Sequence, residues 1–312
     1  MPELPDIAAY VACLKPRVLD RRLQRVRLNS PFLLRSVDPP LKAFEDRPVT
    51  DVRRLGKRIV LAFPDEHYLV LHLMIAGRLH WKEANAKLAG KFVLVGFDFP
   101  GGTLTLTEAG SKRRASLYAV RGDGGLIAHD PGGLEVMTSD RAAFAERLTL
   151  ENHTVKRALT DPRVFSGIGN AYSDEILHRA KLSPLRWTDA LTSEDIDRLF
   201  VACRGVLEEW TERLIREAGA GFPEKVTAFR PGMAAHGRYG EPCPVCRAPI
   251  QRIAYADNET NYCAPCQTSG KLLADRSLSR LLKGDWPRSL VELDELKREA
   301  RTAGLRTPRS TP

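Results

Sequence analysis

The sequence has no long apolar segment. Its longest apolar run, Tyr68–Ala76, contains His72 and is far shorter than the roughly 20 residues that a helix needs to cross a bilayer. The first residues carry neither a basic region nor an apolar core, which argues against a secretory signal peptide. We therefore expect a cytoplasmic protein without membrane contact.

Cysteine is scarce, and its pattern fits a reducing cytosol better than a disulfide framework. Four of the six cysteines form two C-x2-C pairs, Cys243/Cys246 and Cys263/Cys266, with sixteen residues between the pairs. This spacing is typical of the four thiolate ligands of one tetrahedral zinc ion. Two separate redox dithiols are the alternative, but they need a strand-to-helix setting, and the flanking residues favour a β-ribbon. We expect one structural Zn²⁺ as the cofactor, and a four-thiolate site leaves no open position for a substrate.

Acidic residues are fewer than basic ones. The chain of 312 residues has a formal net charge of +9 and a pI near 9.4. Such a balance indicates a polyanionic partner, with nucleic acid ahead of an anionic membrane. The length is large for one core and favours two main domains beside the small zinc module.

The first part of the chain has the alternating pattern of β-strands. A helix over Leu4–Leu19 precedes these strands, and Asp130–Gly133 ends the region. The expected strands are Gln24–Leu28, Val49–Arg54, Arg58–Phe63, Tyr68–Leu73, Phe92–Phe99, Thr103–Thr107 and Leu117–Tyr118. Together they predict two packed sheets.

After this region the apolar period changes to that of helices. The pattern predicts a helix capped by Thr138 or Ser139 and ending at Leu148, and further helices over Thr154–Leu159 and Asn170–Ala180. The longest helix begins at a Thr192/Asp195 cap. Beyond the zinc module, Leu278, Leu281 and Leu282 suggest a short helix, and the end from Arg298 reads as a disordered basic tail. The expected domains are residues 1–133, 134–235, 236–283 and 284–312.

Pro2 and Glu3 are candidates for chemistry at the N-terminus. Methionine before a small residue is normally removed, so we expect the mature chain to start with a proline amine. An α-amino group titrates near pH 8 and is partly nucleophilic at neutral pH. Its attack on an aldehyde-like carbon would form an iminium ion, and the adjacent carboxylate could transfer the protons. The alternative is that Pro2 is merely a terminal proline.

Two other segments suggest phosphate contacts. The turn Gly167–Asn170 leads into a helix, where backbone N–H groups and the helix dipole favour an anion, and Lys156 and Arg157 lie nearby in sequence. Lys57 follows a glycine at the start of an expected strand. A plain turn and a solvated strand end are the alternatives. The expected tip of the zinc ribbon, Tyr255–Thr260, suits a DNA groove.

In this order the motifs resemble the formamidopyrimidine-DNA glycosylase and endonuclease VIII family of base-excision repair enzymes. The resemblance runs from Pro2 to about Lys283. Its anchors are Pro2-Glu3-Leu4-Pro5, Leu55-Gly56-Lys57-Arg58, His72-Leu73-Met74-Ile75-Ala76-Gly77, the Gly167–Asn170 turn with Tyr172 and Glu175, and the four-cysteine finger ending in Gln267.

The resemblance implies a multidomain α+β fold: an N-terminal β-sandwich with an N-terminal helix, a helix–two-turn–helix domain and a C-terminal zinc-finger hairpin. It also implies roles for individual residues. Pro2 matches the Schiff-base nucleophile, Glu3 the acid/base carboxylate, Lys57 a phosphate-binding lysine and Asn170 a phosphate-binding asparagine. The four finger cysteines match the zinc ligands.

Some positions depart from the family pattern. Ile75 aligns with the intercalating methionine and Met74 with a glycine, and either can be an apolar wedge. Asn258 occupies the position of the family's finger arginine and lacks the charge that would clamp a phosphate. Basic residues expected to compensate and to contact DNA are Lys112, Arg113 and Arg114.

The leading hypothesis is a bifunctional DNA glycosylase and abasic-site lyase. It would excise oxidised or ring-opened bases through a Schiff base on Pro2 and nick the strand by β,δ-elimination. The expected partner is double-stranded DNA with damaged bases or abasic sites, bound by a nucleoid-associated monomer. A damage- or abasic-site-binding protein with little base excision is the alternative. A zinc-ribbon transcription or translation factor would explain the charge and the cysteines but not the start of the chain.

Overall fold

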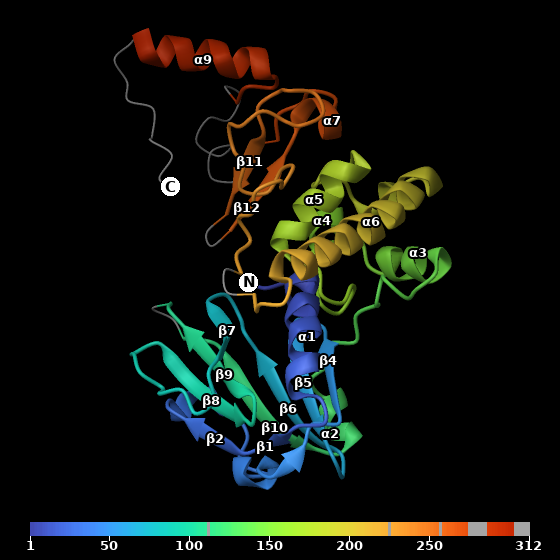
Figure 1. The fold of residues 1–312 in the computed structure, drawn as a ribbon. Coiled ribbons are helices and arrows are strands. Elements are labelled where there is room, and N and C mark those ends of the chain that lie inside the picture. Colours follow the sequence, from blue (N-terminus) through green and yellow to red (C-terminus); the bar gives the residue numbers. More distant parts are fainter. Residues whose placement is uncertain (111–112, 224–225, 256–257, 274–285, 303–312) are drawn as a thin grey trace. The chain divides into compact units, whose positions relative to one another are not determined.

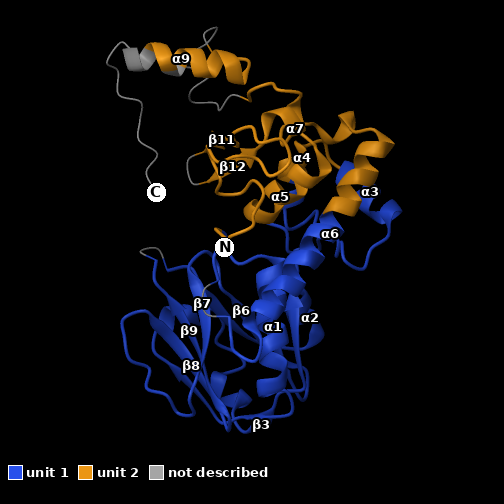
Figure 2. Ribbon diagram, turned by 45° about the horizontal axis from the view of Figure 1, so that its top comes forward, with its two compact units in different colours: residues 1–150, 158–169, 203–228 blue, residues 151–157, 170–202, 229–312 orange. Residues whose placement is uncertain are grey.

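The computed structural model describes residues 1–110, 113–223, 226–255, 258–273 and 286–302 (Figure 1). The chain forms two compact units, each built from several segments (Figure 2). Unit 1 contains residues 1–150, 158–169 and 203–228, and unit 2 contains residues 151–157, 170–202 and 229–312. The expected domain boundaries follow sequence order and stay predictions.

The N-terminal helix α1, Leu4–Val18, confirms the predicted helix. Pro5 lies in its first turn, where no intrahelical N–H partner is needed, and the Glu3 N–H donates to the Asp6 carboxylate at 2.8 Å. One face of the helix is apolar and buried, with Ile7, Tyr10, Leu14 and Val18. The helix contacts β4 and β5 of unit 1 (Figure 1).

Two four-stranded antiparallel sheets form the body of unit 1. The first has the order β10-β6-β5-β4 and the second the order β2-β8-β9-β7. Their strands are β2 (Arg25–Leu28), β4 (Asp51–Leu55), β5 (Arg58–Phe63), β6 (His67–His72), β7 (Gly77–Lys82), β8 (Val93–Phe99), β9 (Gly102–Glu108) and β10 (Ser116–Arg121).

A single apolar core joins the two sheets. Alternate residues of β5 and β6, such as Ile59 and Leu69, belong to the same buried cluster as Phe97 and Leu106 of the other sheet. The two sheets therefore pack face to face, and the predicted β-sandwich is confirmed. The pattern did not predict β7, an edge strand with polar residues between its apolar ones.

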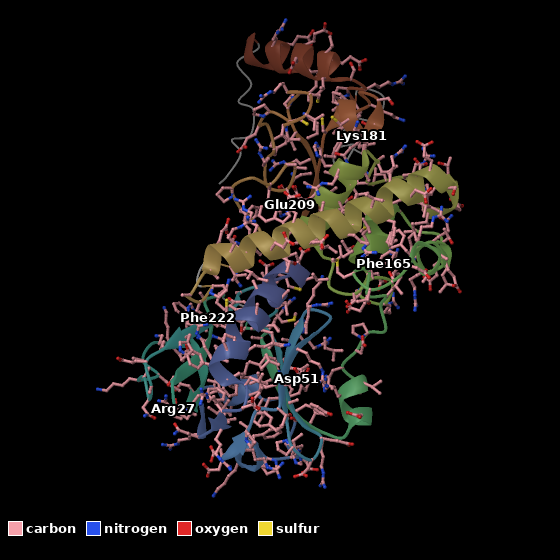
Figure 3. All side chains as sticks on the ribbon, turned by 45° about the vertical axis from the view of Figure 1, so that its right-hand side comes forward. Arg27, Asp51, Phe165, Lys181, Glu209 and Phe222 are labelled. Carbon is pink, nitrogen blue, oxygen red and sulfur yellow. The ribbon has the colours of Figure 1, made fainter. Side chains whose placement is uncertain are left out.

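Short elements complete unit 1. They are β1 (Arg22–Leu23), η1 (Pro31–Leu33), η2 (Leu41–Phe44), β3 (Arg47–Pro48) and α2 (Asp123–Ile127). β1 pairs with β3 as a two-stranded ribbon. The segment after the long helix also belongs to this unit. Its Phe222, labelled in Figure 3, packs against Tyr10. Arg17 donates to the carbonyl oxygens of Ala220 and Gly221.

The helical region contains α3 (Arg141–Thr149), α4 (Val155–Thr160), α5 (Asn170–Ala180), η3 (Thr188–Ala190) and α6 (Ser193–Ala218). The predicted cap of α3 is wrong: the Asp140 carboxylate, one residue beyond Ser139, accepts the Ala143 N–H. The predicted cap of α6 is confirmed, because the side chains of Thr192 and Asp195 each accept the other's backbone N–H.

The finger in unit 2 is a ribbon of β11 (Gln251–Ala254) and β12 (Glu259–Tyr262), followed by α7 (Ala264–Thr268). Helix α9, Leu290–Thr302, comes next. The predicted disorder from Arg298 is wrong for residues up to Thr302, because they continue this helix. Leu290 and Leu293 pack against the buried finger cluster around Tyr262. The predicted helix with Leu278, Leu281 and Leu282 lies outside the described residues.

No described helix is long and apolar enough to cross a membrane.

Candidate functional site

The first residues of the chain are held at the start of α1. Pro2 and Glu3 are buried, and the pyrrolidine nitrogen of Pro2 is bonded to Met1 in the full chain. Removal of Met1 would free this nitrogen as a secondary amine. The carboxylate of Asp6 fixes the Glu3 backbone through its bond to the Glu3 N–H. The backbone on which Pro2 and Glu3 stand is therefore fixed by the helix cap.

A glycine turn within unit 1 holds the Glu3 carboxylate. The Gly169 N–H donates to Glu3 Oε2 at 2.7 Å, and the Leu4 N–H donates to the Gly167 carbonyl at 2.9 Å. A Cβ on residue 169 would lie 2.5 Å from Glu3 Cδ, so any larger residue would displace the Glu3 side chain. Gly167 has a φ of +80°, which favours glycine, and its missing Cβ leaves room for Leu4. The turn thus binds a carboxylate of the chain itself.

Lys57 is presented by a two-residue hairpin loop. β4 and β5 pair up to Leu55 and Arg58, which leaves Gly56 and Lys57 as the loop, and Gly56 has a φ of +58°. Burial lowers the pKa of Lys57, and the negative charge of Glu3 raises it. Within the described ranges no side chain or carbonyl accepts a hydrogen bond from the Lys57 ammonium. This cation is available for an anion beside Glu3.

The same electrostatic environment acts on the chain's terminal amine. Burial lowers the pKa of the Met1 amino group. The positive charges of Arg78 and Lys57 lower this pKa further, and the negative charge of Glu3 raises it. An amine with a lowered pKa is more often unprotonated at neutral pH and is then nucleophilic. His72, at the end of β6, also faces cations: burial, Arg58 and Lys57 lower its pKa to about 4. It is therefore neutral at physiological pH.

The two apolar wedge candidates differ in exposure. Both lie in the turn between β6 and β7, where the Gly77 N–H donates to the Leu73 carbonyl. Ile75 is 59% exposed, whereas Met74 is half-buried and has a φ of +52°. The exposed side chain at the turn is therefore Ile75.

The basic loop between β9 and β10 is only partly described. Arg113 and Arg114 are exposed, and the Arg113 guanidinium donates to the Lys91 carbonyl at 2.8 Å. The buried Glu108 carboxylate accepts the Arg114 N–H at 2.9 Å and so fixes the loop's end. Lys112 lies outside the described residues.

Asn170 begins α5 in unit 2. Its side-chain amide donates to the Glu259 carbonyl of β12 at 2.9 Å. Lys156 does not extend from the surface as a phosphate contact would require. Its ammonium is buried and binds the Asp174 carboxylate and the Asn170 carbonyl. The Asp174 carboxylate also accepts a hydrogen bond from His236 Nδ1 at 2.7 Å.

The finger tip confirms the expected ribbon but carries no charge at position 258. The Tyr255 N–H donates to the Asn258 carbonyl at 2.8 Å, and both side chains are exposed. On the paired strands, Arg252 Nη1 lies 3.5 Å from Glu259 Oε2. The Arg252 guanidinium also lies over the ring of Tyr239, 4.4 Å from the ring centroid.

The four finger cysteines converge on one point. Their Sγ atoms all lie within 4.8 Å of one another, with 4.0 Å between Cys243 and Cys266 and 3.3 Å between Cys246 and Cys263. Tetrahedral zinc with Zn–S bonds of about 2.3 Å needs sulfur atoms roughly 3.8 Å apart. The residues therefore fit the ion, and the predicted structural zinc site is confirmed.

Hydrogen bonds connect this zinc centre to α5 within unit 2. His178 Nε2 lies 3.2 Å from Cys243 Sγ, and the Gln267 side chain links the Cys263 N–H to the Leu182 carbonyl. Such contacts orient metal ligands and support their charge. A zinc ion bound by these cysteines would therefore stabilise the packing of the finger as well as its ribbon.

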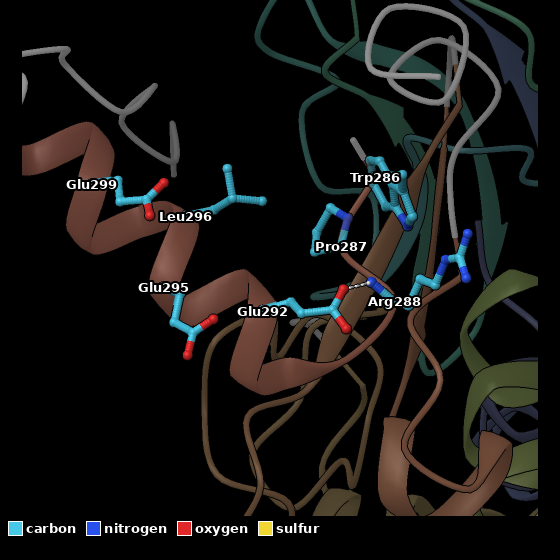
Figure 4. A pocket seen from close by; sticks show the side chains of 7 residues that line it. All are labelled: Trp286, Pro287, Arg288, Glu292, Glu295, Leu296 and Glu299. Atoms are coloured by element: carbon cyan, nitrogen blue, oxygen red, sulfur yellow. Dashed lines mark hydrogen bonds between the residues drawn. The ribbon is translucent and has the colours of Figure 1, made fainter. Parts of the chain in front are cut away.

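A separate pocket lies beside α9. The glutamates Glu292, Glu295 and Glu299 line it together with Trp286 and Leu296 (Figure 4). Its carboxylates make it a poor site for a polyanion. None of its lining residues belongs to the site described above.

Sequence reasoning missed two groups of this site. His72 was quoted only within a motif, and its neutral state depends on the cations that the fold places beside it. Arg54 was not singled out, because its partners Glu135 and Ser166 lie far from it in sequence. A partly buried ion pair between such distant positions leaves no local signal.

Family models match three segments of the chain. Residues 1–114 match the formamidopyrimidine-DNA glycosylase N-terminal domain, and residues 127–216 match the formamidopyrimidine-DNA glycosylase H2TH domain. Residues 240–268 match the zinc finger found in FPG and IleRS.

Curated relatives agree with these matches. Formamidopyrimidine-DNA glycosylase from Symbiobacterium thermophilum is 31% identical over 282 residues, which cover 86% of this chain and 89% of the relative. The Moorella thermoacetica protein of that name is 31% identical over 266 residues, which cover 81% of this chain and 94% of the relative. An uncharacterized formamidopyrimidine-DNA glycosylase-like protein from Mycobacterium tuberculosis is 40% identical over 153 residues, covering 49% of this chain and 93% of the relative.

Solved structures share the fold. The structure of MutM in complex with carbocyclic 8-oxo-G containing DNA has a TM-score of 0.76 at 22% identity, covering 86% of this chain and 100% of that one. Lactococcus lactis formamidopyrimidine-DNA glycosylase, non-covalently bound to DNA with an AP site, has a TM-score of 0.74 at 22% identity, covering 85% and 99%.

A β-sandwich with a buried carboxylate at its first helix, joined to a four-cysteine finger, defines a zinc-finger protein of the DNA-repair glycosylase class. The family models and the full-length relatives make the assignment specific. The chain belongs to the formamidopyrimidine-DNA glycosylase family.

Proposed function

We propose that the protein is a bifunctional DNA glycosylase and abasic-site lyase that acts on oxidised or ring-opened bases in double-stranded DNA. The observation that carries this proposal is the arrangement at the start of α1 in unit 1: Pro2 is buried next to Glu3, the Glu3 carboxylate is held by the Gly169 N–H, and its charge acts on Lys57. Family membership supports glycosylase action on DNA, and the relatives' names support the class of lesion.

Pro2 is the nucleophile of the proposed reaction once Met1 is removed. The damaged nucleotide leaves the base stack, and the Pro2 nitrogen bonds to C1′ of its sugar while the bond from C1′ to the base breaks. The base takes up a proton as it leaves. Opening of the sugar ring gives an iminium ion between Pro2 and C1′.

Glu3 and Lys57 serve this sequence in different ways. The Glu3 carboxylate, held by the Gly169 N–H, transfers protons at the sugar. The iminium acidifies the proton on C2′. Removal of this proton expels the 3′ phosphate by β-elimination. A second elimination, δ-elimination, expels the 5′ phosphate and leaves a gap. The Lys57 ammonium offsets the charge of a phosphate beside the lesion.

Further contacts to DNA are proposed for residues outside this group. Ile75 fills the space left by the extruded nucleotide, and Met74 supports the turn that carries it. Arg113 and Arg114 contact the DNA from the loop after β9. Asn170, whose side-chain amide uses one N–H on the Glu259 carbonyl, binds a backbone phosphate with the other, and Asn258 contacts the backbone without adding charge.

A strand-cleavage assay tests the proposal. Duplexes with an abasic site, a ring-opened purine or an oxidised base are incubated with the wild-type chain and with Pro2→Gly and Glu3→Gln. We expect the wild type to cleave and to be trapped on abasic DNA by borohydride. Pro2→Gly should lose trapping, and Glu3→Gln should lose base excision more than it loses DNA binding.

The outcomes separate the two functions considered. Tight binding to an abasic analogue without cleavage of any lesion duplex would contradict the proposal and favour a damage-binding protein, for which the uncharged Asn258 is the supporting observation. Undiminished trapping by Pro2→Gly would refute the nucleophile.

A further inference from the structure

Arg54 occupies the centre of a polar network in unit 1. Its side chain is 17% exposed and leaves β4 beside the loop that carries Lys57. Nη1 donates to the Gly56 carbonyl at 2.8 Å and to Ser166 Oγ at 3.2 Å. Nη2 binds Glu135 Oε2, and the Ser166 hydroxyl donates to Glu135 Oε1. The guanidinium therefore uses its planar fork on three acceptors.

Two turns meet at this network: the Gly56–Lys57 loop and the turn of residues 167–169. The Gly56 carbonyl belongs to the peptide bond that leads into Lys57, so the bond from Arg54 fixes the loop that presents this lysine. Ser166 precedes the turn whose Gly169 N–H holds Glu3. The second turn also approaches Arg54 directly, because a Cβ on Gly167 would lie 3.2 Å from Nη1.

Two backbone hydrogen bonds connect the segment that carries Glu135 to the same turn. The Ser166 N–H donates to the Leu134 carbonyl at 2.9 Å, and the Leu134 N–H donates to the Val164 carbonyl at 2.9 Å. Glu135 therefore belongs to a segment that pairs with the chain just before the Gly167–Gly169 turn. The ion pair between Arg54 and Glu135 connects this segment to β4.

We propose that Arg54 is a positioning residue that sets the Lys57 ammonium against the Glu3 carboxylate, with Glu135 and Ser166 holding its guanidinium in place. The proposal rests on the function proposed above for Lys57 and Glu3. Arg54 touches neither substrate nor reacting atoms. It acts through the Gly56 carbonyl on one side and the Ser166 hydroxyl on the other.

The network gives the guanidinium a task that a lysine cannot perform. A lysine ammonium is a point charge without the planar fork, and it cannot hold Gly56, Ser166 and Glu135 in the same geometry. We therefore expect Arg54→Lys to keep the fold and the DNA affinity but to lose rate. This separates positioning from the supply of positive charge.

The test measures single-turnover abasic-site cleavage, DNA affinity and pH profile for Arg54→Met, Arg54→Lys and Glu135→Gln. A misplacement of about 1 Å can lower a rate by about 100-fold, so we expect Arg54→Met to lose about that factor in rate with little change in affinity. Arg54→Lys should recover only part of it. The pH profile of Arg54→Met should shift, because the charge of Glu3 raises the pKa of Lys57 and a displaced Lys57 would lose part of this effect.

Arg53→Met is the matched control. Arg53 is the neighbour of Arg54 on β4, but it binds Asp51 and lies over the ring of Tyr68, away from the network. Its replacement removes the same charge and should leave rate and pH profile unchanged. A circular dichroism melt of each variant confirms folding.

Two sets of outcomes distinguish an error in the proposed function from an error in the positioning role. If the wild type neither cleaves abasic DNA nor is trapped by borohydride, the proposed function is wrong. If the wild type is active and folded Arg54→Met or Arg54→Lys matches it in rate and pH profile, the positioning role is wrong. A loss of affinity equal to the loss of rate would also overturn it, because Arg54 would then act in binding.

Discussion

Replacement of Gly169 by alanine perturbs the carboxylate at the centre of the proposed chemistry. In Gly169→Ala the new Cβ would lie 2.5 Å from Glu3 Cδ and 2.6 Å from Glu3 Oε1, well inside the roughly 3.5–4.0 Å of an ordinary contact. Glu3 is buried at the start of α1, so its carboxylate must shift away from the turn. The 2.7 Å hydrogen bond from the Gly169 N–H would be lost with that shift.

The size of the effect follows from this bond. A hydrogen bond to a charged group contributes about 1.5–3 kcal/mol, and each 1.36 kcal/mol on a barrier is about tenfold in rate. We expect the single-turnover rate of base excision to fall by at least about tenfold, with about 10,000-fold as the limit for complete loss of the carboxylate's catalysis. Overpacking should cost about 1–3 kcal/mol of unfolding free energy.

Rapid-quench measurement of base excision, with DNA affinity measured in parallel, checks this prediction. Gly124→Ala is the matched control: Gly124 lies in α2, and a Cβ there would meet nothing within 4 Å. The control should excise bases at the wild-type rate. A folded Gly169→Ala variant with that same rate would refute the role of this turn.

Three further predictions concern other parts of the site. Folding stability should fall between pH 6.5 and pH 4, because the lowered pKa of His72, about 4, means that the unfolded state binds the proton first as the pH drops. Urea titrations of His72→Gln should show a smaller loss over this window, and an unchanged loss would contradict the assignment. Removal of zinc should melt the β11–β12 ribbon and weaken DNA binding, because metal binding is part of the folding free energy of such a finger. Amide exchange of the ribbon before and after chelation tests this, and a protected ribbon without metal would disprove it. Ile75→Ala should slow excision of a paired lesion more than Met74→Ala does, because Ile75 is the exposed side chain of the turn. Fluorescence of 2-aminopurine opposite the lesion measures the extrusion step, and equal effects of the two variants would count against Ile75.

Much of the fold is predictable because its signals are local. The apolar face of α1 and the alternation in β5 and β6 are visible in the sequence, since burial selects side chains with the period of each element. β7 gave a weaker signal, because only Leu79 and Trp81 mark its inward face. The start of α3 was misplaced because three consecutive residues, Thr138 to Asp140, can all cap a helix.

The candidate site was only partly predictable. Spacing alone indicated the zinc ligands, because a C-x2-C pair brings two sulfur atoms to one ion. The partner of the Glu3 carboxylate could not be predicted, since Gly169 lies far along the chain and contributes only a backbone N–H. Lys156 was expected near a phosphate, but its pairing with Asp174 depends on a tertiary contact between α4 and α5. Long-range polar contacts of this kind need the fold itself.

The most direct test of the account identifies the atom that bonds to DNA. Borohydride-reduced complexes of the wild-type chain with abasic DNA are digested, and the modified peptide is sequenced by mass spectrometry. The account predicts a single adduct on the nitrogen of an N-terminal Pro2, in chains that have lost Met1. An adduct on Lys57 or another lysine, or an adduct on chains that retain Met1, would contradict it.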